Sequence, residues 1–320
     1  MSDQFKALII NQEGDNFTRE VKSIDKSFLK HGDVTIKVDY SDLNFKDGMI
    51  LKNGGRLVKE FPHIPGIDLS GTVLESENSK FKEGDEVILT GFRVGEVFFG
   101  GYSQIAKVNA DFLVKKPDNL TSKQAMILGT AGFTSLMSAF AIQARESILL
   151  GDKVNDVLVT GATGGVGSVA VMALTKLGYN VTAVTGKDSK TDYLKSLGAK
   201  NVVNRDEFDK DPRLIDKGLW DGVVDTVGGK ILANAIVQTK PNGIIAVCGN
   251  ANNNELITSV IPFMLRGIKL WGMDSANCSI KRREFIWAEA SKLIDFELLE
   301  TYPKILKGEI SGRVLVDLNK

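Results

Sequence analysis

One stretch of the chain, Val157 to Gly178, limits the possible folds more than any other. It begins with the apolar run VLV, which is typical of a buried parallel strand. The glycine-rich turn GATGGVG follows at residues 161–167, and a helical pattern then runs to Gly178, in the position that a helix C-cap favours. Strand, glycine turn and helix in this order are the context that a dinucleotide-binding fingerprint requires.

The glycines of this turn have a chemical reason. A pyrophosphate binds close to the backbone N–H groups at a helix N-terminus, where unpaired donors and the helix dipole favour negative charge. A side chain at Gly164 would block that approach, and Gly167 would let the helix pack closely on the strand. Ala162 replaces the first glycine of G-x-G-x-x-G, so Gly161 must serve the turn; a merely structural glycine turn is the alternative. The predicted cofactor contacts here are Thr163, Gly164, Gly165 and Val166.

Composition limits the class of protein. The chain has 320 residues, enough for two domains, and 43% of them are hydrophobic, which supports a sizeable core. Forty Lys and Arg residues balance forty Asp and Glu residues, so no basic excess attracts a nucleic-acid backbone. We expect no signal peptide, no membrane span and no nucleic-acid partner. Two cysteines without C-x-x-C spacing suit a reduced, cytoplasmic protein.

Two histidines, His31 and His63, are the chain's only ones. A zinc site needs three or four ligands at suitable spacing, and His and Cys are its usual sources. The sequence has no such spacing. We therefore interpret both histidines as surface or loop residues and predict no metal.

The pattern of apolar residues divides the chain into two regions. Up to residue 122, short alternating runs such as Val34–Tyr40 predict a β-rich domain that resembles a partly open barrel. Over residues 123–293, strands alternate with helices, which predicts an α/β domain with a doubly wound parallel sheet. A last strand pattern, at 312–316, indicates that residues 294–320 return to the first domain. The strands predicted for the sheet are 157–160, 181–184, 201–203, 222–225, 244–247 and 268–272.

The end of the second sheet strand predicts which dinucleotide binds. An Asp or Glu there would bind the 2′-hydroxyl of NAD, but this chain has Thr185, Gly186 and Lys187. Arg205, just after the third strand, could close over the same group. These cations favour the 2′-phosphate of NADPH, and two solvated surface cations are the alternative.

These features together resemble a known family. The β-rich N-terminal domain, the central Rossmann domain and the returning C-terminus resemble the medium-chain dehydrogenase/reductase superfamily, in particular its zinc-free YhdH/YhfP-type quinone oxidoreductases and acryloyl-CoA reductases. The resemblance implies a GroES-like fold for the first domain. Zinc-dependent members carry Gly-His-Glu where this chain has Gly66-Ile67-Asp68. The segments that carry the resemblance are residues 40–47, 65–73, 84–91, 129–134, 161–167, 204–207 and 262–266.

The resemblance implies further site residues. Asn44 and Phe45 are expected in the cleft near the nicotinamide, with Phe45 where the family often has Tyr; Tyr40 is a weaker proton-donor candidate and its alternative is a core position. Thr130 and Thr134 are expected to meet the nicotinamide, unless residues 129–134 are simply a packed helix start. Further cofactor contacts implied by the resemblance are Asn250, Met264, Ser275 and Gly308. Cations that could meet the phosphates of coenzyme A are Lys52, Arg56, Lys59 and Arg93.

Three functions remain open from the sequence. The first is hydride transfer from NADPH to the double bond of a short enoyl-CoA such as acryloyl-CoA. The second is reduction of a quinone by the same fold and cofactor, and the third is non-catalytic binding of NADPH by a redox sensor. The strand at 268–272 is a plausible sheet edge, and its pairing across a two-fold axis would make a homodimer.

Overall fold

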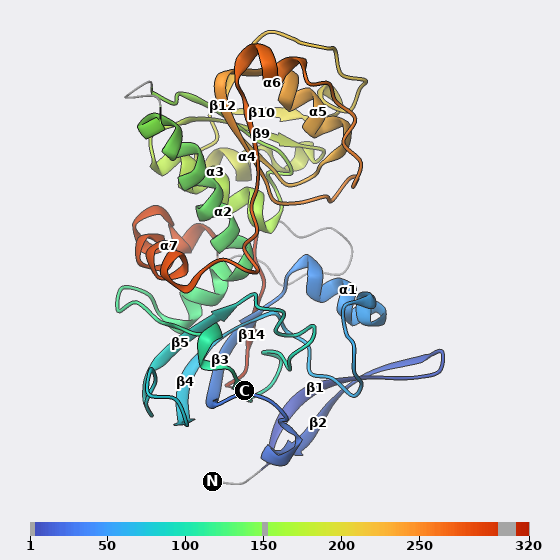
Figure 1. Ribbon diagram of the computed structural model, residues 1–320, viewed down its shortest axis with the longest axis vertical. Coiled ribbons are helices and arrows are strands. Elements are labelled where there is room, and N and C mark those ends of the chain that lie inside the picture. The colour runs from blue at the N-terminus through green and yellow to red at the C-terminus, as the bar shows by residue number, and fades with distance from the viewer. Residues whose placement is uncertain (1–3, 149–152, 300–311, 320) are drawn as a thin grey trace. The chain divides into compact units, whose positions relative to one another are not determined.

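The computed structural model describes residues 4–148, 153–299 and 312–319 of the chain. The chain forms two compact units, and the ribbon of each can be followed in Figure 1. Unit 1 consists of Met1–Thr130, Ser275–Ser291 and Arg313–Lys320, and unit 2 of Ala131–Asp274 and Lys292–Gly312. This division differs from the predicted domains in three ways: unit 1 extends past residue 122 to Thr130, residues 275–291 fall in unit 1, and the C-terminal return to unit 1 begins at Arg313 and not at residue 294.

Unit 1 is built from β-strands, as the sequence predicted. Its main sheet has the order β14-β3-β4-β5-β7, and β6 also pairs with β3. The strands are β3 (Val34–Asp42), β4 (Asp68–Ser76), β5 (Glu86–Thr90), β6 (Ile105–Val108), β7 (Val114–Lys115) and β14 (Leu315–Asp317). All pairings in this sheet are antiparallel, and β14 pairs with β3 in the register Val316↔Ser41. The last strand therefore lies in this unit, paired with β3.

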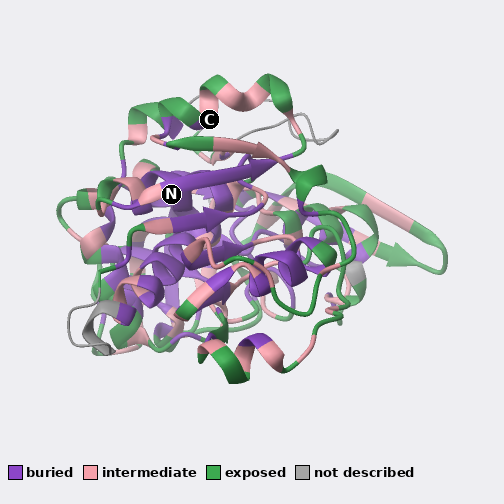
Figure 2. Ribbon diagram, turned by 90° about the horizontal axis from the view of Figure 1, so that it is seen from above, coloured by how far each residue is buried: buried purple, intermediate pink, exposed green. Residues whose placement is uncertain are grey.

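A long hairpin precedes this sheet. It pairs β1 (Gln4–Glu13) with β2 (Asn16–Asp25) in antiparallel register. The sequence analysis missed the second strand, because the β2 side chains are exposed or half-buried and show no clear alternation. Figure 2 shows the hairpin coloured largely as exposed or intermediate.

A short helix, α1 (Phe45–Asn53), follows β3 and was not predicted. Asn44 stands at its N-cap, and the carboxylate of Asp47 accepts the Asn44 backbone N–H at 2.9 Å. Gly54 ends the helix with φ of 73°, a left-handed conformation that favours glycine. An N-cap Asn followed three residues later by an acid is a helix-start signal, so the sequence contained the information for α1.

Unit 2 contains the predicted parallel sheet. Its order is β10-β9-β8-β11-β12-β13, which is the doubly wound order 3-2-1-4-5-6 of dinucleotide-binding folds. All of its pairings are parallel. The strands are β8 (Asp156–Val159), β9 (Asn180–Thr185), β10 (Asn201–Asn204), β11 (Trp220–Asp225), β12 (Thr239–Val247) and β13 (Lys269–Gly272).

Helices connect these strands. Those within unit 2 are α3 (Gly165–Lys176), α4 (Thr191–Ser196), α5 (Gly229–Val237), α6 (Ile261–Arg266) and α8 (Phe296–Leu299). The two that extend past a unit boundary are α2 (Ser122–Ile148) and α7 (Ile280–Leu293). The central strands are apolar and buried, and Figure 2 shows this interior in purple. The core of the sheet includes Leu158, Val184, Val223 and Ile245.

The helix α2 has the length and hydropathy of a membrane span between Ser122 and Arg145. However, 89% of its most apolar window is buried inside the structure, as in the core helix of a globular protein. The helix is interrupted at Gly129, whose φ of 52° and ψ of −156° are not helical.

The interpretation of His63 as a surface or loop residue is wrong. The side chain is 1% exposed and its ring lies edge-on to Phe99, with 5.4 Å between ring centroids. The His63 backbone pairs with that of Ile10, which draws the residue into the core of unit 1. Burial lowers the pKa of the imidazole to about 4, so His63 is neutral at pH 7. His31 is exposed, as expected.

Candidate functional site

The glycine-rich turn of unit 2 joins β8 to α3. Gly161 has φ of 58°, and a Cβ there would collide with Thr226 Oγ1. A Cβ at Gly167 would collide with the Gly161 carbonyl oxygen and lie 2.7 Å from Ala162 Cα. Gly161 therefore makes the turn and Gly167 permits close packing of the helix on the strand, as the sequence predicted.

Packing does not require a glycine at position 164, in contrast to positions 161 and 167. It is the N-cap of α3 in an extended conformation, and a Cβ there would have 3.3 Å to its nearest neighbour, the Gly161 carbonyl oxygen. The fold thus tolerates a side chain at Gly164 far better than at Gly167. The absence of a side chain leaves the first N–H groups of α3 open to an anionic ligand.

A buried carboxylate is hydrogen bonded to the residue that precedes the glycine-rich turn, and the sequence analysis missed this acid. Asp225, at the end of β11, is fully buried and accepts hydrogen bonds from Thr160 Oγ1 at 2.7 Å and the Gly228 N–H at 2.9 Å. Thr226 Oγ1 donates to the Thr160 carbonyl at 2.9 Å. Burial raises the pKa of the Asp225 carboxyl. These bonds tie the ends of β8 and β11 together at the edge where such sheets bind ligands.

The predicted 2′-phosphate residues lie together. Thr185 ends β9 and pairs in register with Asn204, the last residue of β10. The Lys187 N–H donates to Thr185 Oγ1 at 3.1 Å. Arg205 packs against Gly186, and Asp188 accepts a hydrogen bond from Asn204 Nδ2 at 2.9 Å. Two strand ends therefore bring a lysine and an arginine to one corner of the sheet, as the sequence predicted.

The other predicted cofactor residues of unit 2 differ in exposure. Thr134 is 4% exposed in α2, and its carbonyl accepts a hydrogen bond from Ser138 Oγ at 2.8 Å. Asn250 is exposed and its amide donates to Asn254. Met264 on α6 is 74% exposed, available to a ligand. Gly308 lies outside the described residues.

In unit 1, Asn44 is the centre of a buried polar network. Its Nδ2 donates to Asp42 Oδ1 and to Asp68 Oδ2, each at 2.9 Å. Its Oδ1 accepts from Arg313 Nη1 at 3.2 Å. Arg313 also pairs with Asp42, and its Nε donates to the Ile127 carbonyl at 2.9 Å. The network joins the end of β3, the start of α1, the start of β4 and the C-terminal segment.

Thr130 belongs to the same network through Asp68. Its backbone N–H donates to Asp68 Oδ2 and its hydroxyl to Asp68 Oδ1, each at 2.6 Å. The neighbouring Gly129 makes this possible, because a Cβ there would collide with Asp42 Oδ2 and lie 2.8 Å from Arg313 Nη2. The structure thus places Asn44 and Thr130, both predicted site residues, on one carboxylate.

Three carboxyls, those of Asp42, Asp47 and Asp68, are fully buried, and Asp42 is the one that pairs with the Arg313 guanidinium. Burial, and then the charge of Asp68, raises the pKa of Asp42 well above its usual value. Burial raises the pKa of Asp47 to about 7. The sequence analysis missed these acids, although an Asp within the apolar run IPGIDLSG is a signal of a functional or structural polar core.

The remaining predicted residues of unit 1 lie apart from this network. Phe45, the first residue of α1, is 74% exposed. Tyr40 is half-buried on β3, where it pairs with Ser70 and Asp317. The Ser275 carbonyl accepts a hydrogen bond from Arg283 Nη2 at 2.6 Å.

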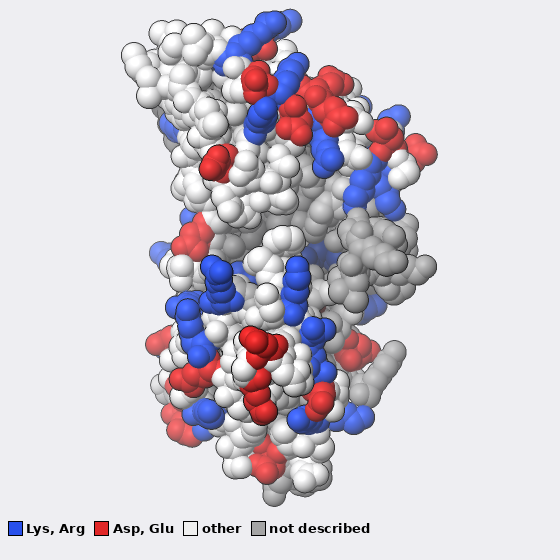
Figure 3. All heavy atoms as spheres, turned by 90° about the vertical axis from the view of Figure 1, so that its right-hand side faces the viewer, with Lys and Arg blue, Asp and Glu red and all other residues white. Residues whose placement is uncertain are grey.

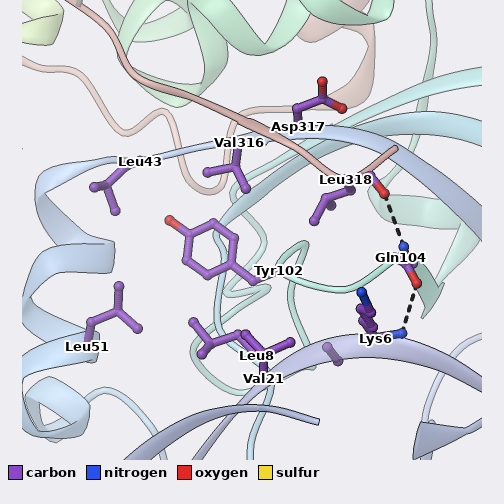
Figure 4. A pocket seen from close by; sticks show the side chains of 11 residues that line it. Lys6, Leu8, Val21, Leu43, Leu51, Tyr102, Gln104, Val316, Asp317 and Leu318 are labelled. Carbon is purple, nitrogen blue, oxygen red and sulfur yellow. Dashed lines mark hydrogen bonds between the residues drawn. The ribbon is translucent and has the colours of Figure 1, made fainter. Parts of the chain in front are cut away.

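Unit 1 also contains a pocket of about 360 Å³, shown in Figure 4. Its walls are mainly apolar and come from the hairpin, α1 and the last strand. Tyr102 lies at its centre in Figure 4, and its hydroxyl donates to the Asp42 carbonyl at 2.9 Å. None of the predicted site residues lines it. The lining residues are Lys6, Ala7, Leu8, Val21, Leu43, Leu51, Tyr102, Gln104, Val316, Asp317 and Leu318.

Comparison with known proteins gives the family context. The model of the alcohol dehydrogenase GroES-like domain matches residues 30–118, and that of the zinc-binding dehydrogenases matches residues 165–294. The acrylyl-CoA reductase AcuI of Ruegeria pomeroyi is 43% identical, over 98% of this chain and 99% of that protein. The structure of Escherichia coli K-12 YhdH with bound NADPH is 40% identical with a TM-score of 0.91, over 98% of this chain and 100% of that one.

A third relative differs in its cofactor. The structure of Bacillus subtilis YhfP with NAD bound is 40% identical, with a TM-score of 0.93, over 99% of this chain and 100% of that one. The curated sequence of this name is described as a quinone oxidoreductase. Relatives of nearly equal similarity thus carry different names and were solved with different dinucleotides.

The residues of this chain do not fit the zinc that one family description mentions. In the described ranges, no three His, Cys, Asp or Glu side chains are grouped so that they could hold a metal ion. His63 is enclosed in the core, and its Nε2 has no hydrogen-bond partner there. The position that carries His in zinc-dependent relatives, Ile67, is apolar and buried.

Proposed function

The chain belongs to the medium-chain dehydrogenase/reductase superfamily, and we propose that it transfers hydride from NADPH to the double bond of a short enoyl thioester such as acryloyl-CoA. It is an oxidoreductase with a nicotinamide cofactor. The near-complete alignment with the acrylyl-CoA reductase of R. pomeroyi, at 43% identity, is the observation that carries the choice of substrate.

The residues of unit 2 fit the dinucleotide. The first turn of α3, with Thr163, Gly164, Gly165 and Val166, would hold the pyrophosphate. Thr185, Gly186, Lys187 and Arg205 would hold the 2′-phosphate of the adenosine ribose. Asn250, Met264 and Thr134 are proposed contacts on the nicotinamide side, together with Ser275 and Gly308.

When bound, NADPH supplies the hydride from nicotinamide C4. The residues of unit 1 would orient the acceptor. Phe45 offers an exposed ring face for packing, and Asn44 is held rigidly by Asp42 and Asp68. Precise placement of this kind can contribute up to about 7–11 kcal/mol to lowering the barrier.

The deciding experiment compares two acceptors. The oxidation of NADPH is followed with acryloyl-CoA and, separately, with 1,4-benzoquinone. We expect a much larger kcat/KM for the thioester. Efficient reduction of the quinone with poor reduction of the thioester would instead establish the second candidate, a quinone oxidoreductase, which the name of the B. subtilis relative favours.

We also propose that the enzyme is a cytoplasmic, zinc-free homodimer. All four residues of β13, the last strand of the parallel sheet, are exposed, and Leu270 and Trp271 are 40% and 42% exposed. Such an apolar edge suits pairing with a second copy. Light scattering should give twice the 34.8 kDa chain mass, and a monomer would contradict the dimer.

Two further measurements test the other parts of this proposal. Metal analysis should find no stoichiometric zinc, and cell fractionation should recover the protein with the cytoplasm.

A further inference from the structure

The pocket of unit 1 is not used by the proposed function. Residues of unit 1 alone form it, and its lining includes none of the residues assigned to NADPH or to the thioester. We propose that it binds a free medium-chain fatty acid, with the alkyl chain inside the pocket and the carboxylate at one end. This inference does not depend on which acceptor the enzyme reduces.

The walls of the pocket suit an alkyl chain. Its volume of about 360 Å³ lies in the range of about 300–1,000 Å³ that is typical of small-molecule sites. Leu8 on β1 and Val21 on β2 are opposite each other in the hairpin, so both side chains stand on the same face of it. Val21 is 68% exposed, although valine is usually buried. Six aliphatic side chains line the pocket: Leu8, Val21, Leu43, Leu51, Val316 and Leu318.

The last strand contributes to the pocket through alternate residues. Successive side chains of a strand point to opposite faces, so Val316 and Leu318 share one face and Asp317 has the other. Figure 4 shows Val316 directed toward Tyr102 and Asp317 directed away from it. Asp317 Oδ1 also accepts the backbone N–H and the side-chain amide of Asn319, at 3.0 and 3.1 Å. The Asp317 carboxylate therefore does not face a ligand in the pocket.

The polar groups of the pocket lie at one end. In Figure 4, Lys6 and Gln104 are together on one side of Tyr102. Leu43 and Leu51 are on the opposite side. Lys6 is exposed and takes part in none of the ion pairs of the described residues. Aliphatic walls with an ammonium group at one end are complementary to an alkyl carboxylate.

Gln104 fixes the geometry of this polar end. Its Oε1 accepts the Lys6 backbone N–H at 2.9 Å, and its Nε2 donates to the Leu318 carbonyl at 3.4 Å, as the dashed lines in Figure 4 show. Its backbone N–H donates to the Lys6 carbonyl at 3.0 Å. A side-chain amide has two N–H donors, and the hydrogen bonds of the described residues use one of them. The second N–H and the Lys6 ammonium are the donors that we assign to the carboxylate.

The opposite end has no group that would bind a second charge. The Tyr102 hydroxyl already donates its proton to the Asp42 carbonyl at 2.9 Å. Leu43 and Leu51 have no polar side-chain atoms. A ligand with one charged end and an apolar tail therefore fits the pocket better than a dicarboxylate or a sugar, whose further polar groups would be buried without partners.

A homologous series of ligands tests the apolar part on the wild-type protein. Calorimetric titration with butanoate, hexanoate and octanoate should give an affinity that rises about fourfold for each added methylene. An affinity that does not rise along the series, or no binding of octanoate at millimolar concentration, would overturn the proposal. Octanoate should still bind when the protein is saturated with NADPH. Displacement of octanoate by NADPH would place it in the cofactor site and also overturn the proposal.

A reversal of charge tests the polar end. Octanoate should bind the wild-type protein more tightly than octylamine does, and Lys6→Glu should weaken octanoate about 10-fold and strengthen octylamine by a similar factor. A gain for octylamine cannot result from misfolding. Lys30→Glu makes the same change of charge at an exposed site outside the lining, and as the matched control it should leave both affinities unchanged. An unchanged octanoate affinity in Lys6→Glu, or an equal loss in both variants, would overturn the site. If Lys6→Glu fails to fold, the series on the wild-type protein decides.

Discussion

Arg205 lies directly against Gly186, and a Cβ on residue 186 would come within 2.6 Å of Arg205 Nε. The two residues come from the ends of neighbouring parallel strands, β9 and β10. Arg205 therefore lies against the residue that precedes Lys187, whose backbone N–H donates to Thr185 Oγ1. It gives the cofactor preference a specific structural basis that mutation can test.

We expect Lys187→Ala combined with Arg205→Ala to weaken NADPH binding and spare NADH. Loss of two charge-assisted contacts with a phosphate should cost about 3 kcal/mol, or roughly 100-fold in Kd. Titration of both cofactors by fluorescence measures the change, with Lys176→Ala, an exposed residue of α3, as the control. Equal losses for both cofactors would contradict the assignment of these residues to the 2′-phosphate. The test matters because the structure of B. subtilis YhfP was solved with NAD bound.

Gly164 and Gly167 should respond differently to alanine. Gly167→Ala places a methyl group against the backbone of Gly161 and Ala162 and should destabilise the protein by about 2–3 kcal/mol or more. Gly164→Ala meets its nearest atom at 3.3 Å and should change stability by less than about 1 kcal/mol. It should still weaken NADPH binding at least about 10-fold. Urea unfolding and cofactor titration of both variants test this contrast; unimpaired binding by Gly164→Ala would mean that the turn is purely structural.

Asp47 should make the protein less stable as the pH rises from about 4 to 7. Its pKa is raised from 3.8 to about 7 by burial, so the folded state binds a proton that the unfolded state has released. The stabilisation from this proton is complete below pH 3.8 and is lost as the pH rises through 7, by up to about 4 kcal/mol. In Asp47→Asn the slope of unfolding free energy against pH should be smaller over this range. The control is Asp15→Asn, at an exposed turn; an unchanged slope in Asp47→Asn would refute the assignment.

Cations around the end of α1 should favour a coenzyme A thioester. Arg19 Nη2 donates to the Lys52 carbonyl at 3.5 Å, and Lys59 Nζ lies 3.4 Å from the Arg56 carbonyl. Among the ion pairs of the described residues, none involves these four cations. Figure 3 faces the side on which α1 lies and shows several Lys and Arg side chains there.

The length of α1 is similar to the length of the pantetheine arm of coenzyme A. The nine residues of α1 extend about 13 Å from Phe45. An extended pantetheine arm, comparable to about four extended amino-acid residues, spans on the order of 14 Å. Lys52→Ala combined with Arg56→Ala should raise KM for acryloyl-CoA about 10-fold and leave KM for acryloyl-pantetheine unchanged. Steady-state kinetics with both thioesters decides, and a parallel rise for both would place the phosphates elsewhere.

Local sequence signals predicted the parts of the fold that are formed by neighbours in the chain. The turn at residues 161–167 and the following helix depend on contiguous residues, and the exposed β13 edge follows from the strand order. The helix α1 was missed although Asn44 and Asp47 form a helix-start signal, because the segment's hydrophobic periodicity is weak.

The buried network could not be found in this way. Asp42, Asp68, Thr130 and Arg313 are far apart in the chain, and charged residues are usually exposed. Only the folded sheet shows that one carboxylate holds both Asn44 and Thr130. His63 was misjudged for the same reason, because the strand pairing with Ile10 that buries it is a long-range contact.

The pairing of Asp42 with Arg313 has a consequence for biosynthesis. The two residues are 271 positions apart, and β14 pairs with β3 across a similar span. A ribosome therefore releases the whole of unit 2 before Asp42 can pair with Arg313. A nascent chain that lacks Arg313 has no guanidinium beside Asp42 and no β14 beside β3, so the N-terminal unit is completed last although its synthesis begins first.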